Sequence, residues 1–140
     1  MSGSDPHDLN RFLQAQNRAF EAARTELRNG RKTSHWMWFV FPQIAGLGHS
    51  SMARRYAIAS LAEAKAYLAH PVLGPRLHEL TGILAALTVT DARAIFGDVD
   101  AIKFRSSMTL FDAVEPGGVF AKALDHFFAG ERDPATLERI

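Results

Sequence analysis

The sequence predicts a mainly α fold built as one compact helical domain, and three observations carry that prediction. The chain has 140 residues, which suits a single domain that buries roughly two thirds of its unfolded surface. Apolar residues recur at spacings of three and four along most of its length. No internal repeat, low-complexity stretch or linker divides it. We therefore expect one helical domain over residues 8–138, a flexible leader over residues 1–7, and an irregular aromatic segment near residues 35–43.

The first half of the chain contains two predicted helices and two segments of undecided structure. Asp8 is expected to cap a helix that ends near Asn29. Ser60 and Glu63 have the spacing of a capping box, which predicts a helix over residues 61–69. Between these helices, the apolar run at 36–41 and the segment 52–58 each fit either a short helix or a strand.

The second half contains four predicted helices and a final turn. They are expected over residues 73–87, 91–96, 98–111 and 119–128, with the last turn at 133–134. Thr90 or Asp91 is expected to cap the short helix that Gly97 stops, and Asp98 or Asp100 the helix that follows.

Charge and composition exclude several classes of protein. Lys plus Arg is 16 and Asp plus Glu is 15, so the net charge of +1 excludes an overall basic nucleic-acid binder. The absence of cysteine excludes a disulfide scaffold, thiolate metal sites and a cysteine nucleophile. No signal peptide is visible, and the longest apolar run is far short of the ~20 residues that a membrane span needs. We expect a cytoplasmic protein without a membrane partner.

The aromatic segment is the first candidate site. The chain has ten Phe, two Trp and two Tyr, and five of these rings lie between positions 36 and 56. Such a run usually forms core, yet Trp36 and Trp38 can also stack on a flat ligand. The two indoles point the same way if the segment is extended and diverge if it is helical. Lys32, His35 and Gln43 would supply polar groups around such a platform.

Two further stretches can bind a polar ligand. Glycines at 46 and 48, followed by Arg54, Arg55 and Tyr56, can cradle an anion, although a mobile turn before a solvated basic pair fits equally. Helical spacing places Lys103, Ser106 and Ser107 on one face, with Asp100 and Asp112 nearby; ordinary solvated residues are the alternative. No serine-hydrolase elbow or zinc-binding histidine spacing occurs, so we predict no metal and no cofactor.

Several of these stretches resemble a known bacterial family. They are residues 10–16, 34–43 (SHWMWFVFPQ), 46–48, 56–58, 70–77, 95–97 and 103–111 (KFRSSMTLF). Over about residues 8–138 the chain resembles the family catalogued as domain of unknown function 1810. That family is similar in fold to the YbiA-like, or NADAR, group. The group is mainly α and is associated with ADP-ribose and NAD-type ligands and with hydrolysis of N-glycosidic bonds to ribose phosphates.

The resemblance implies a small protein that binds a nucleotide-like or ribose-phosphate ligand and hydrolyses an N-glycosidic bond. The expected ligand-binding residues are Lys32, His35, Trp36, Trp38, Gln43, Arg55, Tyr56, Lys103, Ser106 and Ser107. Asp100 or Asp112 would be the catalytic carboxylate, since an oxocarbenium-like transition state normally needs one. The NADAR Glu-His pairing and late acidic motif have no visible counterpart here. The alternative is a non-catalytic interaction module or homodimer that uses the aromatic segment.

Overall fold

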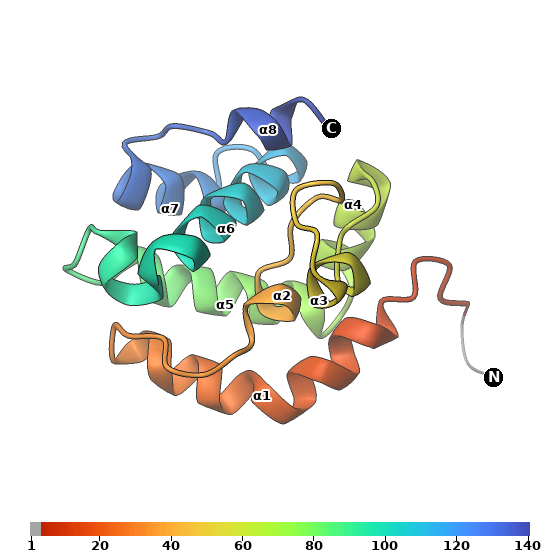
Figure 1. The fold of residues 1–140 in the computed structure, drawn as a ribbon, viewed down its shortest axis with the longest axis horizontal. Coiled ribbons are helices and arrows are strands. Elements are labelled where there is room, and N and C mark those ends of the chain that lie inside the picture. The colour runs from red at the N-terminus through yellow and green to blue at the C-terminus, as the bar shows by residue number, and fades with distance from the viewer. Residues whose placement is uncertain (1–3) are drawn as a thin grey trace.

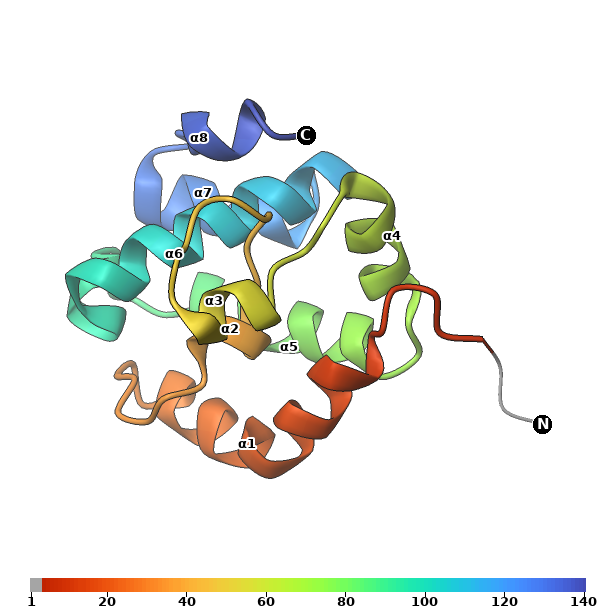
Figure 2. The same cartoon turned by 45° about the vertical axis from the view of Figure 1, so that its right-hand side comes forward.

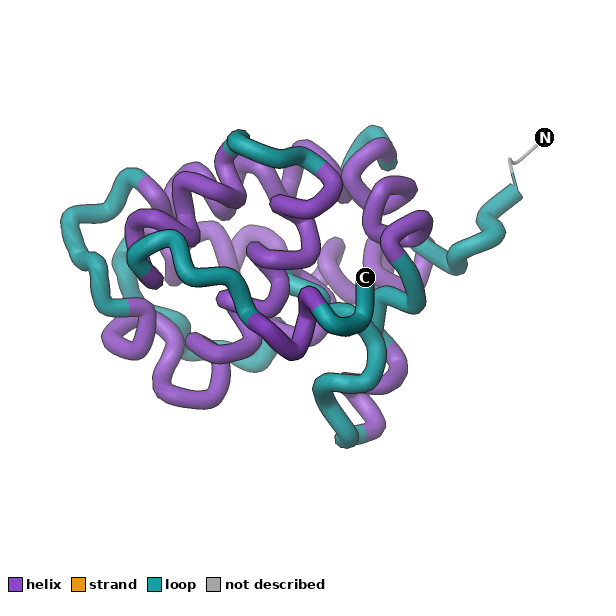
Figure 3. Tube along the Cα trace, turned by 90° about the horizontal axis from the view of Figure 1, so that it is seen from above, coloured by secondary structure: helices purple, strands orange, loops and turns teal. Residues whose placement is uncertain are grey.

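Helices and their connecting loops make up residues 4–140, which are the residues that the structure, a computed structural model, describes (Figure 1). The helices are α1 (Asn10–Arg28), α2 (Met37–Val40), α3 (Ser51–Arg55), α4 (Leu61–Ala69), α5 (Leu73–Ala85), α6 (Ala92–Val114), α7 (Val119–Phe128) and α8 (Pro134–Leu137). Figure 3 shows helices and loops but no strand in this part of the chain. The prediction of a single, mainly α domain is confirmed.

The helices pack in tiers around a buried aromatic core. α5 contacts α1 on one side and α7 on the other, and α6 contacts α4, α7 and α8. Figures 1 and 2 show the same order, with α1 lowest, α5 above it, and α6 and α7 above α5. Phe104 of α6 is fully buried. Four rings surround it: Phe96 from the first part of α6, Phe41 from the loop after α2, and Phe127 and Phe128 from α7.

The start of α1 differs from the prediction. Asp8 has a left-handed φ of 50° and does not cap the helix. Instead the carboxylate of Asp5 accepts hydrogen bonds from the backbone N–H groups of Leu9 (2.8 Å) and Asn10 (3.0 Å). The expected cap at Asp8 is therefore wrong, because a carboxylate three residues earlier reaches the free N–H groups. Residues 1–3 of the predicted leader lie outside the described residues.

A kink at Gly97 joins the two helices predicted on either side of it. The backbone there has φ 81° and ψ 170°, a conformation that favours glycine, and helix continues on both sides as α6. Asp91 caps the element by accepting from Arg93 N at 3.0 Å. Gly97 therefore interrupts the helix where the sequence predicts a stop, and Asp98 directly follows it at the start of the second part of α6. Asp100 lies further inside that second part.

The loop between α2 and α4 is fixed by a short backbone pairing. Ala45 N donates to Ile58 O, and Ile58 N donates to Gln43 O, both at 2.8 Å, around an isolated bridge between Ile44 and Ile58. Gly48 lies so close to α3 that an added Cβ would meet Ala53 Cβ at 2.6 Å. The loop is thereby held between α2 and α3, and Gln43 has a fixed position in it.

The predicted cap of α4 by Ser60 is confirmed, and the Glu63 carboxylate reaches back one residue further than in a standard capping box. Ser60 Oγ accepts from Glu63 N at 3.2 Å, and Glu63 Oε1 accepts from Ala59 N at 3.3 Å. We expect Ser60→Ala to lower the free energy of unfolding by about 1 kcal/mol, because it leaves an N–H of the first turn without its partner. Urea unfolding followed by circular dichroism measures this loss. Ser51→Ala, at an exposed residue that caps nothing, is the matched control, and an equal loss there would contradict the assignment.

Candidate functional site

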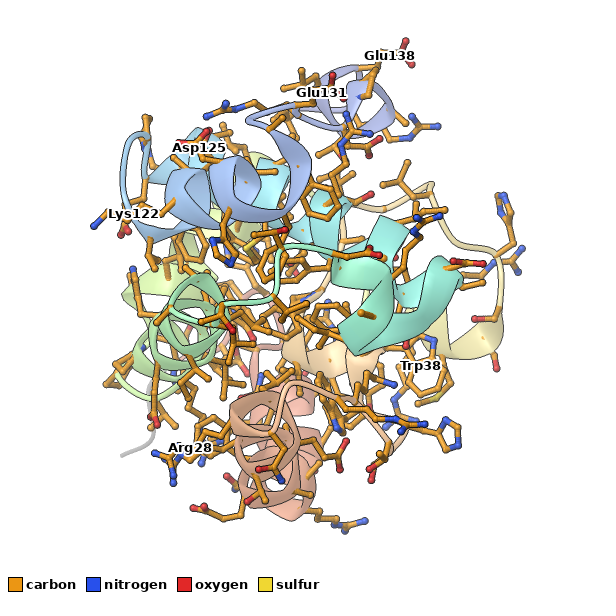
Figure 4. All side chains as sticks on the ribbon, turned by 90° about the vertical axis from the view of Figure 1, so that its left-hand side faces the viewer. Arg28, Trp38, Lys122, Asp125, Glu131 and Glu138 are labelled. Carbon is orange, nitrogen blue, oxygen red and sulfur yellow. The ribbon has the colours of Figure 1, made fainter. Side chains whose placement is uncertain are left out.

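The two tryptophans have different surroundings. Residues 37–40 form the single turn α2, so the indoles of Trp36 and Trp38 diverge, as a helical segment requires. Trp36 is 1% exposed and belongs to the core, whereas Trp38 is half-buried. Figure 4 shows Trp38 on the right-hand side of the view, with Arg28 and Lys122 on the left. Trp38 is therefore the tryptophan that a ligand can reach.

Glu26 of α1 holds the chain leading into α2. One of its carboxylate oxygens, Oε1, accepts from Thr33 N (2.8 Å), Ser34 N (2.9 Å) and Trp36 Nε1 (3.0 Å). Burial acts to raise the pKa of Glu26, but hydrogen bonds from Ser34, Thr33 and Trp36 outweigh it and lower the pKa to about 2. Sequence reasoning missed this residue. The available signal was that a buried indole N–H needs an acceptor, but nothing in the sequence said which one.

A groove begins at Trp38 and runs toward α6. Its first part is a cavity of about 130 Å³ lined by Trp38, Gln43, Gly46, Tyr56 and the backbone around them. Its second part, about 290 Å³, is lined by Gln43, Lys103, Ser106 and the C-terminal residues Asp133 and Ala135. Gln43 and Gly48 border both parts. We refer to the two together as the Trp38 groove.

A carboxylate between two lysines lies beside this groove. Asp100 pairs with Lys32 at 3.0 Å and with Lys103 at 3.7 Å. Lys32 N donates to Ile95 O at 2.8 Å, which holds the loop against α6. The Lys103 ammonium lies 5.5 Å from the centre of the Trp38 ring, and that of Lys32 lies 5.1 Å from the Trp36 ring. Two ammonium groups share one carboxylate, so the cluster keeps a net positive charge.

The predicted residues further along α6 have partners in the C-terminal segment. Ser106 Oγ donates to Asp133 Oδ2 at 2.9 Å, and Asp133 also caps α8. Burial acts to raise the pKa of Asp133, and the hydrogen bonds from Thr136 and Ser106 outweigh it, so the pKa lies below its usual value. Asp112 pairs with Arg132 at 3.0 Å. These contacts fasten residues 130–136 onto α6.

The remaining predicted residues are spread over different surroundings. Ser107 is fully buried, and its hydroxyl has no hydrogen-bond partner within residues 4–140. His35 is exposed. Tyr56 is 7% exposed and forms a wall of the Trp38 groove. Arg55 lies in a separate notch on the other side of Tyr56. The structure thus brings together Lys32, Trp36, Trp38, Gln43, Tyr56, Asp100, Lys103 and Ser106, but leaves Arg55 and Asp112 apart from them.

Sequence reasoning also missed a buried polar group beneath α2. Gln16 Nε2 donates to Phe39 O at 2.7 Å and to the Tyr67 hydroxyl at 2.8 Å. Burial raises the pKa of Tyr67, which keeps its hydroxyl neutral. These bonds fix the turn that carries Trp38. Gln16 lies among the apolar positions of α1. A polar residue at such a position was the sequence signal for a buried group that needs hydrogen-bond partners.

Neither a metal site nor a membrane-spanning helix is present in residues 4–140. This part of the chain contains no group of three metal-ligating side chains placed to hold an ion. It also contains no helix with the length and apolar character needed to cross a membrane.

The fold and the groove define a class: mainly α proteins of one domain, with a half-exposed tryptophan between a glycine-containing loop and a lysine-bearing helix. The chain belongs to the family described as Protein of unknown function (DUF1810), whose model matches residues 6–140. It is similar to the conserved hypothetical protein Rv1873 of Mycobacterium tuberculosis. The crystal structure of that protein matches with a TM-score of 0.93 and 47% identity over 96% of each chain. No curated protein matches.

Proposed function

We propose that the protein binds, in the Trp38 groove, a small ligand that carries a flat ring and an anionic group, of the nucleotide or ribose-phosphate type. The single observation that carries this proposal is that Trp38, Gln43 and Lys103 converge on one groove. An indole suits stacking on a ring, an amide offers donors and an acceptor, and an ammonium binds phosphate. The similarity to the NADAR group, which the sequence suggests, favours an ADP-ribose or NAD-type ligand within this class.

The charge beside the groove supports an anionic ligand. Lys32 is committed to Asp100 at 3.0 Å, with its side chain 9% exposed, whereas Lys103 is 3.7 Å from Asp100 and 23% exposed. Lys103 is therefore the ammonium that can turn toward a ligand while Lys32 stays paired with the Asp100 carboxylate. Trp38 binds the ring, Gln43 hydrogen-bonds it, and Lys103 pairs with phosphate.

Hydrolysis of an N-glycosidic bond is the finer part of the proposal. It needs a carboxylate near the developing oxocarbenium ion. Asp100 is the better supported of the two predicted carboxylates, because its partner Lys103 lines the groove while Asp112 is held by Arg132. Asp100 would stabilise the positive charge on the ribose as the bond between C1′ and the base nitrogen breaks. The oxygen of a water molecule then bonds to C1′, and the proton that this water loses goes to the departing base.

The binding test is a titration of the purified chain with ADP-ribose, NAD and a pyrimidine nucleoside monophosphate, by calorimetry and thermal shift. We expect Trp38→Ala to weaken binding by about 5- to 150-fold, since stacking of a base on an aromatic ring contributes about 1–3 kcal/mol. Lys103→Gln should weaken the binding of the phosphorylated ligands. Lys122→Gln, an equal charge change at an exposed residue of α7, should leave their binding unchanged. No binding by any of the three ligands would refute the proposal.

Hydrolysis is tested by measuring the release of the free base or nicotinamide by chromatography. Asp100→Asn should stop release, while binding of the intact ligand persists. Since this change leaves Lys32 without its partner, urea unfolding of the variant must show that the fold is retained. If the native chain binds the ligand but releases no base, the proposal of hydrolysis is wrong and only the proposal of binding remains.

A homodimer or interaction module is the second candidate function, and one observation favours it. Val99 and Ile102, one turn apart on α6, are each 67% exposed although both are apolar. Such a module would use these two residues, because Trp36, Phe39 and Phe41 of the aromatic segment are buried and only the Trp38 ring is partly exposed. Light scattering tests it: self-association that Val99→Ser with Ile102→Ser removes would favour the module, and a monomer at all concentrations would exclude the homodimer.

A further inference from the structure

A second polar cavity lies outside the Trp38 groove, between α1 and the end of α3. Figures 1 and 2 both show α3 above α1. The cavity is about 170 Å³ and is lined by Arg11, Gln14, Ala15, Arg18, Arg55 and Tyr56. We call it the arginine notch. Three of its six lining residues are cationic and none is acidic.

Arg11 lines the notch, but all of its guanidinium nitrogens already have partners within the protein. Its guanidinium pairs with Glu63 at 2.8 Å, with both side chains largely buried. Its other N–H groups donate to the backbone oxygens of His7, Asp8, Arg55 and Ala57. The charge of Arg11 is therefore neutralised, and its role is to fix the end of α3. In particular, its bond to Arg55 O at 2.8 Å holds the Arg55 backbone at the rim of the notch.

The other two arginines are not neutralised. Within residues 4–140, neither Arg18 nor Arg55 forms an ion pair or a side-chain hydrogen bond. Arg55 lies over the Tyr56 ring, 5.5 Å from its centre, which limits where its guanidinium can go. Two guanidinium groups thus face one notch without a counter-charge. Like charges at such a site repel, and an anion between them removes the repulsion.

We propose that the arginine notch binds a phosphate group, as the free dianion or as a phosphate monoester. Guanidinium groups match phosphate oxygens in pairs of parallel hydrogen bonds. Two unneutralised cations match a dianion better than a monoanionic carboxylate. Gln14 supplies a further donor at the rim. This site is independent of the Trp38 groove, since Tyr56 is buried between the two.

The test is calorimetric titration of the full chain with inorganic phosphate, with glycerol 3-phosphate and with acetate, at low salt. We expect both phosphates to bind and acetate not to bind, and the tighter of the two phosphates identifies the source of the group. Amide shifts in NMR spectra should cluster at Gln14, Arg18 and Arg55. Acetate binding as tight as phosphate, or no phosphate binding, would overturn the proposal.

Variants make the location specific. Arg18→Gln and Arg55→Gln should each weaken phosphate binding about tenfold, as the loss of one charged hydrogen-bonding partner does. Arg28→Gln, the same charge change at an exposed residue in the last turn of α1 (labelled in Figure 4) that does not line the notch, is the matched control and should leave the affinity unchanged. An equal loss in Arg28→Gln would mean nonspecific attraction and overturn the site.

A last variant separates this inference from the proposed function. Trp38→Ala should leave phosphate affinity at the notch unchanged, whatever it does to nucleotide binding. If Trp38→Ala abolished phosphate binding, the anion would belong to the Trp38 groove and the notch would be refuted.

Discussion

Replacement of Phe104 by alanine is expected to lower the free energy of unfolding by about 4 kcal/mol. Phe104 is fully buried, and its ring stacks on Phe96 at 4.9 Å and meets Phe41 edge-on at 5.1 Å. Truncation removes the burial of a whole ring and leaves a cavity that rigid neighbours on three segments cannot fill. A domain is stable by only about 5–15 kcal/mol, so the variant should lose a large share of its stability. Urea unfolding followed by circular dichroism measures the change.

The matched control is Phe128→Ala. Phe128 packs on the same ring, at 6.2 Å, but is partly exposed, so its removal should cost clearly less than that of Phe104. Equal losses at the two positions would mean that the core is not centred on Phe104. The comparison matters for the groove, because Phe41 lies immediately after the turn that carries Trp38 and packs against Phe104.

The helices were predictable because they depend on local patterns. The range 61–69 coincides with α4, and Ser60 caps it as expected. The segment 36–41 was not predictable, because most of its side chains are buried in either conformation and periodicity then carries no signal. Its turn is decided by distant groups: Gln16 bonds to Phe39 O, and Glu26 holds the preceding loop.

The types of residue in the candidate site could be predicted from the sequence better than which of them lie together in the fold. Sequence reasoning selected Lys32, Trp38, Asp100 and Lys103, which the fold brings within contact distance. It also selected Asp112, whose partner Arg132 arrives from the C-terminal segment. Whether a carboxylate is open to a ligand depends on which cation the fold places against it. The sequence of α6 alone cannot reveal which cation that is. The exposure of the apolar Ile102 on α6 likewise depends on how the rest of the chain packs.

Glu26→Ala is expected to lower the free energy of unfolding by about 3 kcal/mol. One carboxylate oxygen accepts from Thr33, Ser34 and Trp36, and hydrogen bonds to a charged group contribute more than neutral ones. Removing it leaves the buried indole N–H of Trp36 without an acceptor. In a Trp38→Phe background, fluorescence then reports Trp36 alone, and its emission should change in Glu26→Ala. Glu21→Gln, at a side chain 80% exposed on the same helix, should change stability little.

The contribution of Glu26 should also depend on pH in a defined direction. Its pKa is about 2 in the folded chain against 4.5 as the ordinary value, so between these limits the unfolded chain binds more protons than the folded one. The stabilisation is therefore complete above pH 4.5 and is lost as the pH falls toward about 2. Glu26→Gln keeps an oxygen acceptor but no charge, so the stability difference between native and variant should shrink across that window. A difference that stays constant from pH 6 to pH 2.5 would show that the loop is held by the oxygen alone and not by its charge.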